Sequence, residues 1–389
     1  MRKLILTLNI LMLTACATSP ELTPTATNVA PTATYAPRVT PAWQAHLWAT
    51  RTAIIDATDI PILTTPTFAI DTPTAYDDFA MHPDGQTLVA VGEQQLDLFT
   101  VNAEGLTLRE TITPGIDVIR LEKVAYTPDG EQILVGGTKP DDDRDTNVPE
   151  PVLFAAQEDR LEVVFESDRS YIQGSTVALA AGQTHISFVY NLAGSSCGRS
   201  RNTTVTVTTN DLQLQSIESD YIKPDVRAVA YENHTAIAVS GNACSPGWTI
   251  NLFEGGQQVA HYPYSMVALS ENYLVLVNRP SYDAQESNVL VLDRKTQARI
   301  NDYIVPFLPE DIQIGWAEAY FLVDTSHREP DLLIDLLSGE VVAKLALPDL
   351  AEETMRVNSG AVLFADRLYV SQGTQQLLVY DLPEFDVAG

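Results

Sequence analysis

Short hydrophobic runs alternate with polar turn signals from about residue 67 to the end of the chain. The runs are rich in Val, Ile, Leu and Tyr, and no convincing amphipathic helix interrupts them. Short runs bounded by Gly, Pro, Asn and Asp are typical of β-strands, whereas a helix needs a longer pattern with a period of about 3.6 residues. The pattern therefore predicts an all-β domain over residues 67–389.

A tight turn marks the start of each repeat of this pattern. His82–Gly85 reads His-Pro-Asp-Gly and precedes the run Leu88–Val91, while Thr127–Gly130 reads Thr-Pro-Asp-Gly and precedes Ile133–Val135. Pro presets the backbone of such a turn, and Gly permits the positive φ that it needs. Weaker copies with other polar pairs follow at steps of about 39 to 52 residues, which is the period of a repeat protein.

Each repeat also carries a second hairpin, most clearly over Val289–Ile300 and Leu333–Lys344. Four strands at this period predict the blades of a β-propeller. The alternatives are six or eight blades, or a pair of β-sandwiches, which fits the even spacing less well. We expect seven blades at approximately residues 73–113, 120–167, 172–219, 224–262, 264–304, 310–346 and 354–382.

The last of these repeats lacks an outer strand, and one strand-like run, Thr67–Asp71, precedes the first repeat. A closed propeller leaves no gap where its ends meet, because full closure removes exposed strand edges. We therefore expect Thr67–Asp71 to complete the last blade, the alternative being that this run is only linker.

The Pro-Asp-Gly turns and the Asp-x-x-Ser-Gly hairpin at Asp335–Gly339 resemble the repeats of YVTN, TolB-like and PQQ-like β-propellers. The resemblance covers residues 67–389 and implies a fold, not an activity. It brings no quinone site, because only Trp248 and Trp316 lie within the repeats and the docking tryptophans of PQQ-like proteins do not recur. We therefore expect no organic cofactor.

The N-terminus begins with the basic pair Arg2 and Lys3, followed by the apolar run Leu4–Leu13 and then Leu13-Thr14-Ala15-Cys16. The apolar run is shorter than the roughly 20 residues that span a bilayer and has the length of a secretory signal. The motif resembles the lipobox of bacterial lipoproteins. That resemblance implies removal of residues 1–15 and lipid, with palmitate among its acyl chains, on the sulfur of Cys16. An ordinary signal peptide is the alternative.

Two segments separate this signal from the repeats. Residues 16–40 are dominated by Thr, Pro and Ala, which bury too little surface to offset the entropy of ordering, so a disordered, extended stalk is expected. Residues 41–66 are expected to be a short helix or linker. The whole arrangement predicts a domain held outside the cytoplasm by a lipid in the cell membrane or the outer membrane.

The chain carries 51 acidic and 23 basic side chains, a formal net charge of −28. Binding to nucleic acid needs a basic face, so this charge excludes nucleic acid as an expected partner. High acidity also keeps an exposed protein soluble and unassociated, so we expect a monomeric propeller.

Cys197 and Cys244 remain once Cys16 is assigned to lipid. They follow strands of equivalent rank in adjacent repeats, and an even pair in an exported protein indicates a disulfide. In the chain-entropy model, closing a loop of about 47 residues stabilises a fold by about 4 kcal/mol.

One acidic loop has the composition of a calcium site. Asp141, Asp143, Asp145 and Asn147 alternate, as ligands do in oxygen-rich Ca²⁺ loops. Thr146 occupies the position where an EF-hand needs Gly, so the sequence favours a solvated acidic loop over a metal site.

No nucleophile elbow, zinc-protease motif or phosphate-binding loop is found in the sequence. A propeller has no chemistry by default, so we expect a binding or scaffold module for a protein, a peptide or a glycan. The alternative is an extracellular lactonase-type hydrolase with a central Ca²⁺ site. Its ligands would come from acidic residues near the inner strands: Asp77, Asp78, Glu122, Glu310 and Asp311.

Overall fold

The computed structural model describes sixteen segments of the chain. They are residues 60–140, 149–157, 159–166, 174–192, 201–208, 214–216, 226–242, 245–278, 286–306, 311–314, 318, 320–324, 331–345, 361–364, 367–371 and 375–382. The regular structure in these segments is β-strand, as the alternation of apolar and polar runs predicts. None of the described segments contains a helix that is long and apolar enough to cross a membrane.

The strands form six four-stranded sheets and one five-stranded sheet within the described residues. The first sheet contains β3 (Asp78–Met81), β4 (Thr87–Gly92), β5 (Gln95–Asn102) and β6 (Gly105–Ile112). The second contains β7 (Arg120–Tyr126), β8 (Ile133–Pro140), β9 (Pro149–Gln157) and β10 (Arg160–Glu166). The third contains β11 (Gly174–Ala181), β12 (His185–Leu192), β13 (Arg201–Thr208) and β14 (Leu214–Ser216).

The remaining sheets follow the same order along the chain. The fourth contains β15 (Val226–Tyr231), β16 (His234–Asn242), β17 (Ser245–Glu254) and β18 (Gln257–Tyr262). The fifth contains β19 (Met266–Leu269), β20 (Tyr273–Asn278), β21 (Ser287–Asp293) and β22 (Arg299–Val305). The five-stranded sheet contains β23 (Asp311–Ile314), β24 (Tyr320–Asp324), β25 (Asp331–Asp335), β26 (Val341–Leu345) and β1 (Ile62–Leu63). The last contains β27 (Ala361–Phe364), β28 (Arg367–Ser371), β29 (Gln376–Asp381) and β2 (Phe68–Asp71).

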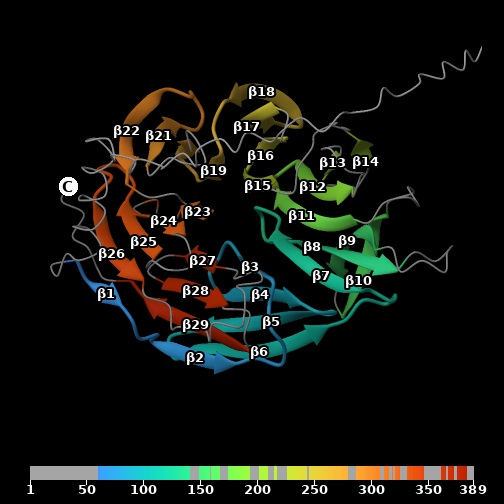
Figure 1. Cartoon of the computed structure of the whole chain (residues 1–389). Coiled ribbons are helices and arrows are strands. Elements are labelled where there is room, and N and C mark those ends of the chain that lie inside the picture. Colours follow the sequence, from blue (N-terminus) through green and yellow to red (C-terminus); the bar gives the residue numbers. More distant parts are fainter. Residues whose placement is uncertain are drawn as a thin grey trace, which may run out of the picture. The chain divides into compact units, whose positions relative to one another are not determined.

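These sheets are arranged in a ring, with the first strand of each sheet innermost (Figure 1). Each innermost strand contacts the innermost strand of the next sheet, from β3 and β7 through to β23 and β27. Strand β27 in turn contacts β3, so the ring closes on itself. The predicted all-β propeller fold is therefore confirmed.

The hydrophobic core lies between neighbouring sheets. One cluster joins the first two sheets through Val89 and Leu121, and another joins the fifth sheet to the next through Val291 and Leu332. Inner and middle strands such as β4 are buried on both faces, which explains why they read as continuous apolar runs.

The strand that closes the ring is the one that the sequence predicts. Strand β2 pairs antiparallel with β29, with Phe68 opposite Val379 and Asp71 opposite Gln376. The fourth strand of the last sheet thus comes from the N-terminal side of the domain, and the alternative of a linker over these residues is wrong.

A second N-terminal strand is not predicted. Ile62 and Leu63 form β1, which lies parallel to β26, and the N–H of Lys344 donates to the carbonyl of Pro61 at 2.9 Å. Leu63 packs against the apolar cluster shared with the last sheet. The expectation that all of residues 41–66 are helix or linker is therefore wrong for β1, because the open edge of β26 accepts another strand. Residues 41–59 lie outside the described part of the chain.

The Pro-Asp-Gly turns adopt the backbone that their sequence predicts. Gly85 has a φ of 73° and Gly130 a φ of 75°. A Cβ atom on Gly130 would lie 2.1 Å from Nε2 of His82, which belongs to the preceding sheet. Glycine here thus serves both the turn and the close approach of two sheets.

A polar pocket at the turns of three neighbouring sheets

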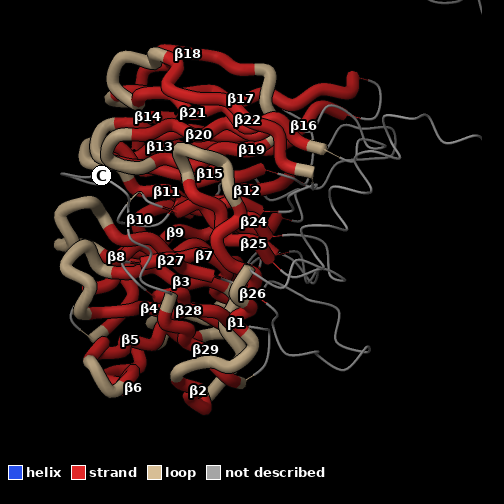
Figure 2. The backbone as a smooth tube through the Cα atoms, turned by 90° about the vertical axis from the view of Figure 1, so that its left-hand side faces the viewer, coloured by secondary structure: helices blue, strands red, loops and turns tan. Residues whose placement is uncertain are grey.

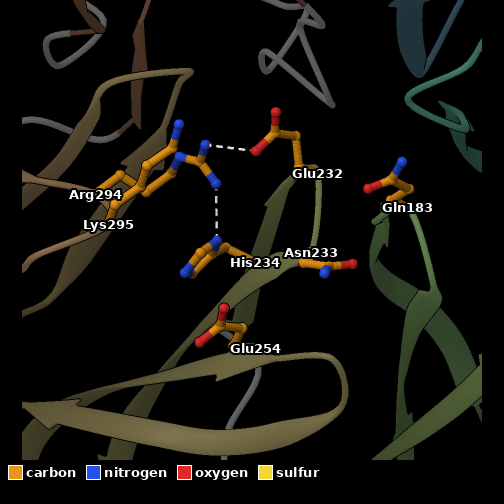
Figure 3. A pocket seen from close by; sticks show the side chains of 7 residues that line it. All are labelled: Gln183, Glu232, Asn233, His234, Glu254, Arg294 and Lys295. Carbon is orange, nitrogen blue, oxygen red and sulfur yellow. Dashed lines mark hydrogen bonds and ion pairs between the residues drawn. The ribbon is translucent and has the colours of Figure 1, made fainter.

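The turns between the first and second strands and those between the third and fourth strands lie on one side of the ring, because successive strands are antiparallel (Figure 2). We call this side the AB/CD face. A pocket of about 330 Å³ opens on it where the third, fourth and fifth sheets meet. Its lining consists of Gln183, Glu232, Asn233, His234, Glu254, Arg294 and Lys295 (Figure 3).

Arg294 is the structural centre of the pocket. It follows β21, its side chain is 0% exposed, and its three side-chain nitrogens are all hydrogen-bonded. Nε donates to the carbonyl of Glu271 at 2.8 Å, Nη1 donates to Nδ1 of His234 at 2.8 Å, and Nη2 donates to Oε2 of Glu232 at 2.7 Å. Its guanidinium carbon also lies 4.9 Å from the ring centre of Tyr231. Arg294 therefore joins the fifth sheet to the fourth.

The contact with Arg294 fixes the protonation of His234. A guanidinium only donates hydrogen bonds, so Nδ1 of His234 must accept and the ring proton must be on Nε2. Burial and the neighbouring positive charge of Arg294 both lower the pKa of His234 below 6.5. Nε2 makes no hydrogen bond to a described residue and is not among their fully buried polar atoms, so it is open to solvent in the pocket.

Glu232 is held in place by its ion pair and by its turn. The hydrogen bond from Arg294 lowers the pKa of its carboxyl group. Its φ is 48°, a left-handed backbone conformation that is uncommon for a residue with a Cβ atom. Its carbonyl accepts a hydrogen bond from the N–H of Gln183 in the third sheet. Such strain persists where surrounding contacts determine the backbone, and it clusters at functional sites.

Further turns of the AB/CD face are linked in the same way. Oγ1 of Thr184 donates to Oδ1 of Asn233 at 3.1 Å. Asn272 donates to the carboxylate of Glu318 through both its backbone N–H and its side-chain amide, each at 2.6 Å. Glu318 also has a positive φ, 57°. Hydrogen bonds therefore connect four successive sheets at this face.

Two charged side chains of the pocket remain in solvent. Glu254 ends β17 and makes no hydrogen bond or ion pair within the described part of the chain. Lys295 lies beside Asp293, whose pKa is lowered chiefly by hydrogen bonds from Thr296 and further by Lys295. The accessible groups of the pocket are thus mainly carboxylate and amide groups.

The acidic residues proposed for a central calcium site have other partners. The buried carboxylate of Asp77 forms an ion pair with Arg120 through both oxygens. Asp78 accepts a hydrogen bond from the N–H of Val124 at 3.0 Å and lies 3.9 Å from Nζ of Lys123. Burial raises the pKa of Asp78, against the opposing effect of Lys123. Glu122 is also engaged in an interaction.

The described residues contain no group of three or more His, Cys, Asp or Glu side chains that could hold a metal ion. The side chain of Asp311, at the start of β23, is outside the description. Other predicted site residues lie outside the described residues altogether: Cys16, Glu310, Cys197 and Cys244, and the acidic loop residues Asp141, Asp143, Asp145 and Asn147.

Comparison with known proteins identifies a fold. No family model matches the chain, and no curated protein matches it. A chain in the structure titled "Crystal Structure of Mitotic Checkpoint Complex" is similar with a TM-score of 0.55 and 12% identity, over 83% of this chain and 96% of that one. Saccharomyces cerevisiae Sqt1 has a TM-score of 0.48 and 9% identity, over 83% of this chain and 100% of its own. At 12% identity the similarity to the first of these shows the fold alone, which is a β-propeller.

Proposed function

We propose that this chain is a lipid-anchored extracytoplasmic lipoprotein whose propeller is a scaffold that binds a protein partner. The observation that carries this proposal is the closed ring of sheets, in which β27 contacts β3 and β2 completes the last sheet. A closed ring holds many turns in fixed positions on two faces, and loops on a rigid scaffold are where binding sites usually lie.

We count the six four-stranded sheets and the five-stranded sheet as seven blades of one propeller. The unbroken contact between successive innermost strands supports this count. The motifs that resemble YVTN and TolB-like repeats support placing the chain among such propellers, and the lipobox-like motif that ends at Cys16 supports the lipid anchor.

A protein partner is favoured over the other candidates. The similar propeller of known structure was solved within a complex, the mitotic checkpoint complex. The net charge of −28 argues against nucleic acid. The lactonase-type alternative has less support, because Asp77 is paired with Arg120 and Asp78 with a backbone N–H and Lys123.

Two experiments test this function. Radiolabelled palmitate should label the full chain expressed in bacteria and should not label a Cys16→Ser variant; equal labelling would overturn the lipid anchor.

A photo-crosslinking amino acid at exposed Ile116, in the β6–β7 loop, or at exposed Glu104, on the AB/CD face, should capture a discrete protein on intact cells. If neither position captures a protein, the scaffold function is wrong.

A further inference from the structure

We infer that the pocket on the AB/CD face binds a neutral sugar residue. The carboxylates of Glu232 and Glu254 would accept hydrogen bonds from its hydroxyl groups, and Nε2 of His234 and the amide of Asn233 would donate to them. This inference goes beyond the proposed function, because a sugar is recognised here whether or not the scaffold also binds a protein.

The charges that line the pocket cancel one another. Glu232 and Glu254 carry two negative charges, and Arg294 and Lys295 carry two positive ones. His234 is neutral, because burial and Arg294 both lower its pKa below 6.5. A cation would meet the two basic side chains and an anion would meet the two carboxylates, so neither gains a net attraction. The pocket therefore selects for a polar ligand without a charge.

Both hydrogen-bond donors and acceptors are exposed in the pocket. The Nε2–H of His234 is open to solvent, and the exposed Asn233 accepts from Thr184 through Oδ1 while its Nδ2 donates to no described residue. Glu232 is 48% exposed with only Oε2 in its ion pair, and the exposed Glu254 makes no hydrogen bond within the described segments. A sugar hydroxyl both donates and accepts, so it matches this mixture, whereas an ammonium only donates and a carboxylate only accepts.

The side chains that would bind the sugar are held in place without it. One buried guanidinium, that of Arg294, donates to both His234 and Glu232 (Figure 3). Thr184 of the third sheet holds Asn233, and the left-handed φ of 48° at Glu232 fixes the turn between them. Binding therefore has to order few side chains, and a small ligand with weak individual contacts gains affinity from this rigidity.

The size and walls of the pocket suit a single sugar ring. A volume of about 330 Å³ is at the lower end of the range for ligand pockets. All seven lining side chains are polar or charged, so an entering ligand displaces hydrogen-bonded water. Affinity is lost unless the ligand reproduces those hydrogen bonds. Sugar hydroxyls reproduce them, and an apolar group does not.

The test titrates the full chain with small sugars and follows binding by saturation-transfer difference NMR. The probes are the methyl glycosides of glucose, galactose, mannose and N-acetylglucosamine. At least one should bind with a millimolar dissociation constant, at least about fivefold more tightly than its amino-sugar and uronic-acid derivatives. Lactose and maltose identify the source: equal binding of a disaccharide with the same terminal sugar supports the end of a glycan, and its exclusion supports a free sugar.

Two variants locate the binding. Glu254→Gln should weaken the neutral glycoside about fivefold, because a charged acceptor is lost, and should reduce the discrimination against the uronic acid, because the lining becomes positive. Glu104→Gln is the matched control and should change neither, since Glu104 is an exposed acid on the same face in the distant β5–β6 turn. Circular dichroism confirms that each variant is folded.

Four outcomes would overturn the inference: no glycoside binds, a charged derivative binds as tightly as the neutral sugar, the two variants lose affinity equally, or N-acetylglycinamide binds as tightly as the sugars, which would indicate a site for peptide backbone. If no sugar binds while photo-crosslinking at Ile116 still captures a protein, the pocket assignment fails and the scaffold function stands.

Discussion

At the scale of single residues, Arg294 is the side chain on which the seam between the fourth and fifth sheets depends. Arg294→Met would leave Glu232 without its ion pair and the carbonyl of Glu271 and Nδ1 of His234 without their donor. Because the side chain of Glu232 is 48% exposed, solvent takes over its charge, and the loss comes from the two acceptors left without a donor, at about 1–3 kcal/mol each. We expect a loss of that size in the free energy of unfolding, measured by urea denaturation.

The control for this substitution is Arg299→Met, five residues along the chain. Arg299 is paired with Asp302, but both side chains are more than half exposed, so the pair is screened by solvent. Exposed pairs contribute about 0–1 kcal/mol. Similar losses in the two variants would show that the hydrogen bonds of Arg294 do not hold the seam together.

The neutral His234 predicts a particular dependence of stability on pH. Its pKa in the folded chain is below the value of 6.5 that it has when unfolded. As the pH falls through 6.5, the unfolded chain takes up a proton that the folded chain does not, so stability falls by up to about 1.4 kcal/mol per pH unit. Carboxyl groups with a lowered pKa, such as that of Glu232, change the stability only when the pH falls below their ordinary pKa of 4.5.

The measurement is the free energy of unfolding at pH 7 and pH 5 for the wild type and for His234→Gln, in which an amide oxygen replaces Nδ1 as acceptor. The difference between the two pH values should shrink in the variant, because the glutamine does not titrate. His261→Gln, at an exposed position of β18, should leave it unchanged. An unchanged difference in His234→Gln would contradict the neutral, buried histidine.

At the scale of strands, sequence reasoning succeeds where local chemistry decides the outcome. Pro and Gly in the β3–β4 and β7–β8 turns specify a backbone that most other residues avoid, so those turns can be located from the sequence. The pairing of β2 follows from counting strands in a closed ring. The pairing of β1 does not, because two residues carry no recognisable pattern and its partner β26 lies about 280 positions away in the chain.

We expect strand β2 to contribute more than strand β1 to the stability of the closed ring. Phe68 packs in the cluster between the last and first sheets, and the guanidinium carbon of Arg367 lies 5.5 Å from its ring centre. Phe68→Ala should lower the free energy of unfolding by about 2–3 kcal/mol, since it removes a partly buried aromatic ring. Ile62→Ala in β1, where the side chain is 51% exposed, should change it by less than about 0.5 kcal/mol.

Urea denaturation of the two variants beside the wild type gives this comparison. A small loss in Phe68→Ala would indicate that the antiparallel backbone pairing of β2 with β29, and not the ring of Phe68, closes the propeller.

At the scale of the whole molecule, the fold could be predicted from the sequence and the pocket could not. Repeats of one small sheet appear as a period, because each sheet buries the same kind of surface against its neighbours. The pocket brings together residues 183 to 295 from three sheets, and its central member, Arg294, reads in the sequence as an ordinary solvated turn residue beside Lys295. Only the stacking of the sheets reveals that this charge is buried.

The net charge of −28 makes a last prediction, which concerns the effect of salt on stability. Self-repulsion destabilises a compact, highly charged chain, so screening by sodium chloride should raise the melting temperature by about 2–4 °C between low and physiological ionic strength. Differential scanning calorimetry at the two ionic strengths measures this shift. A melting temperature that did not rise would show that repulsion among the acidic side chains does not limit the stability of the fold.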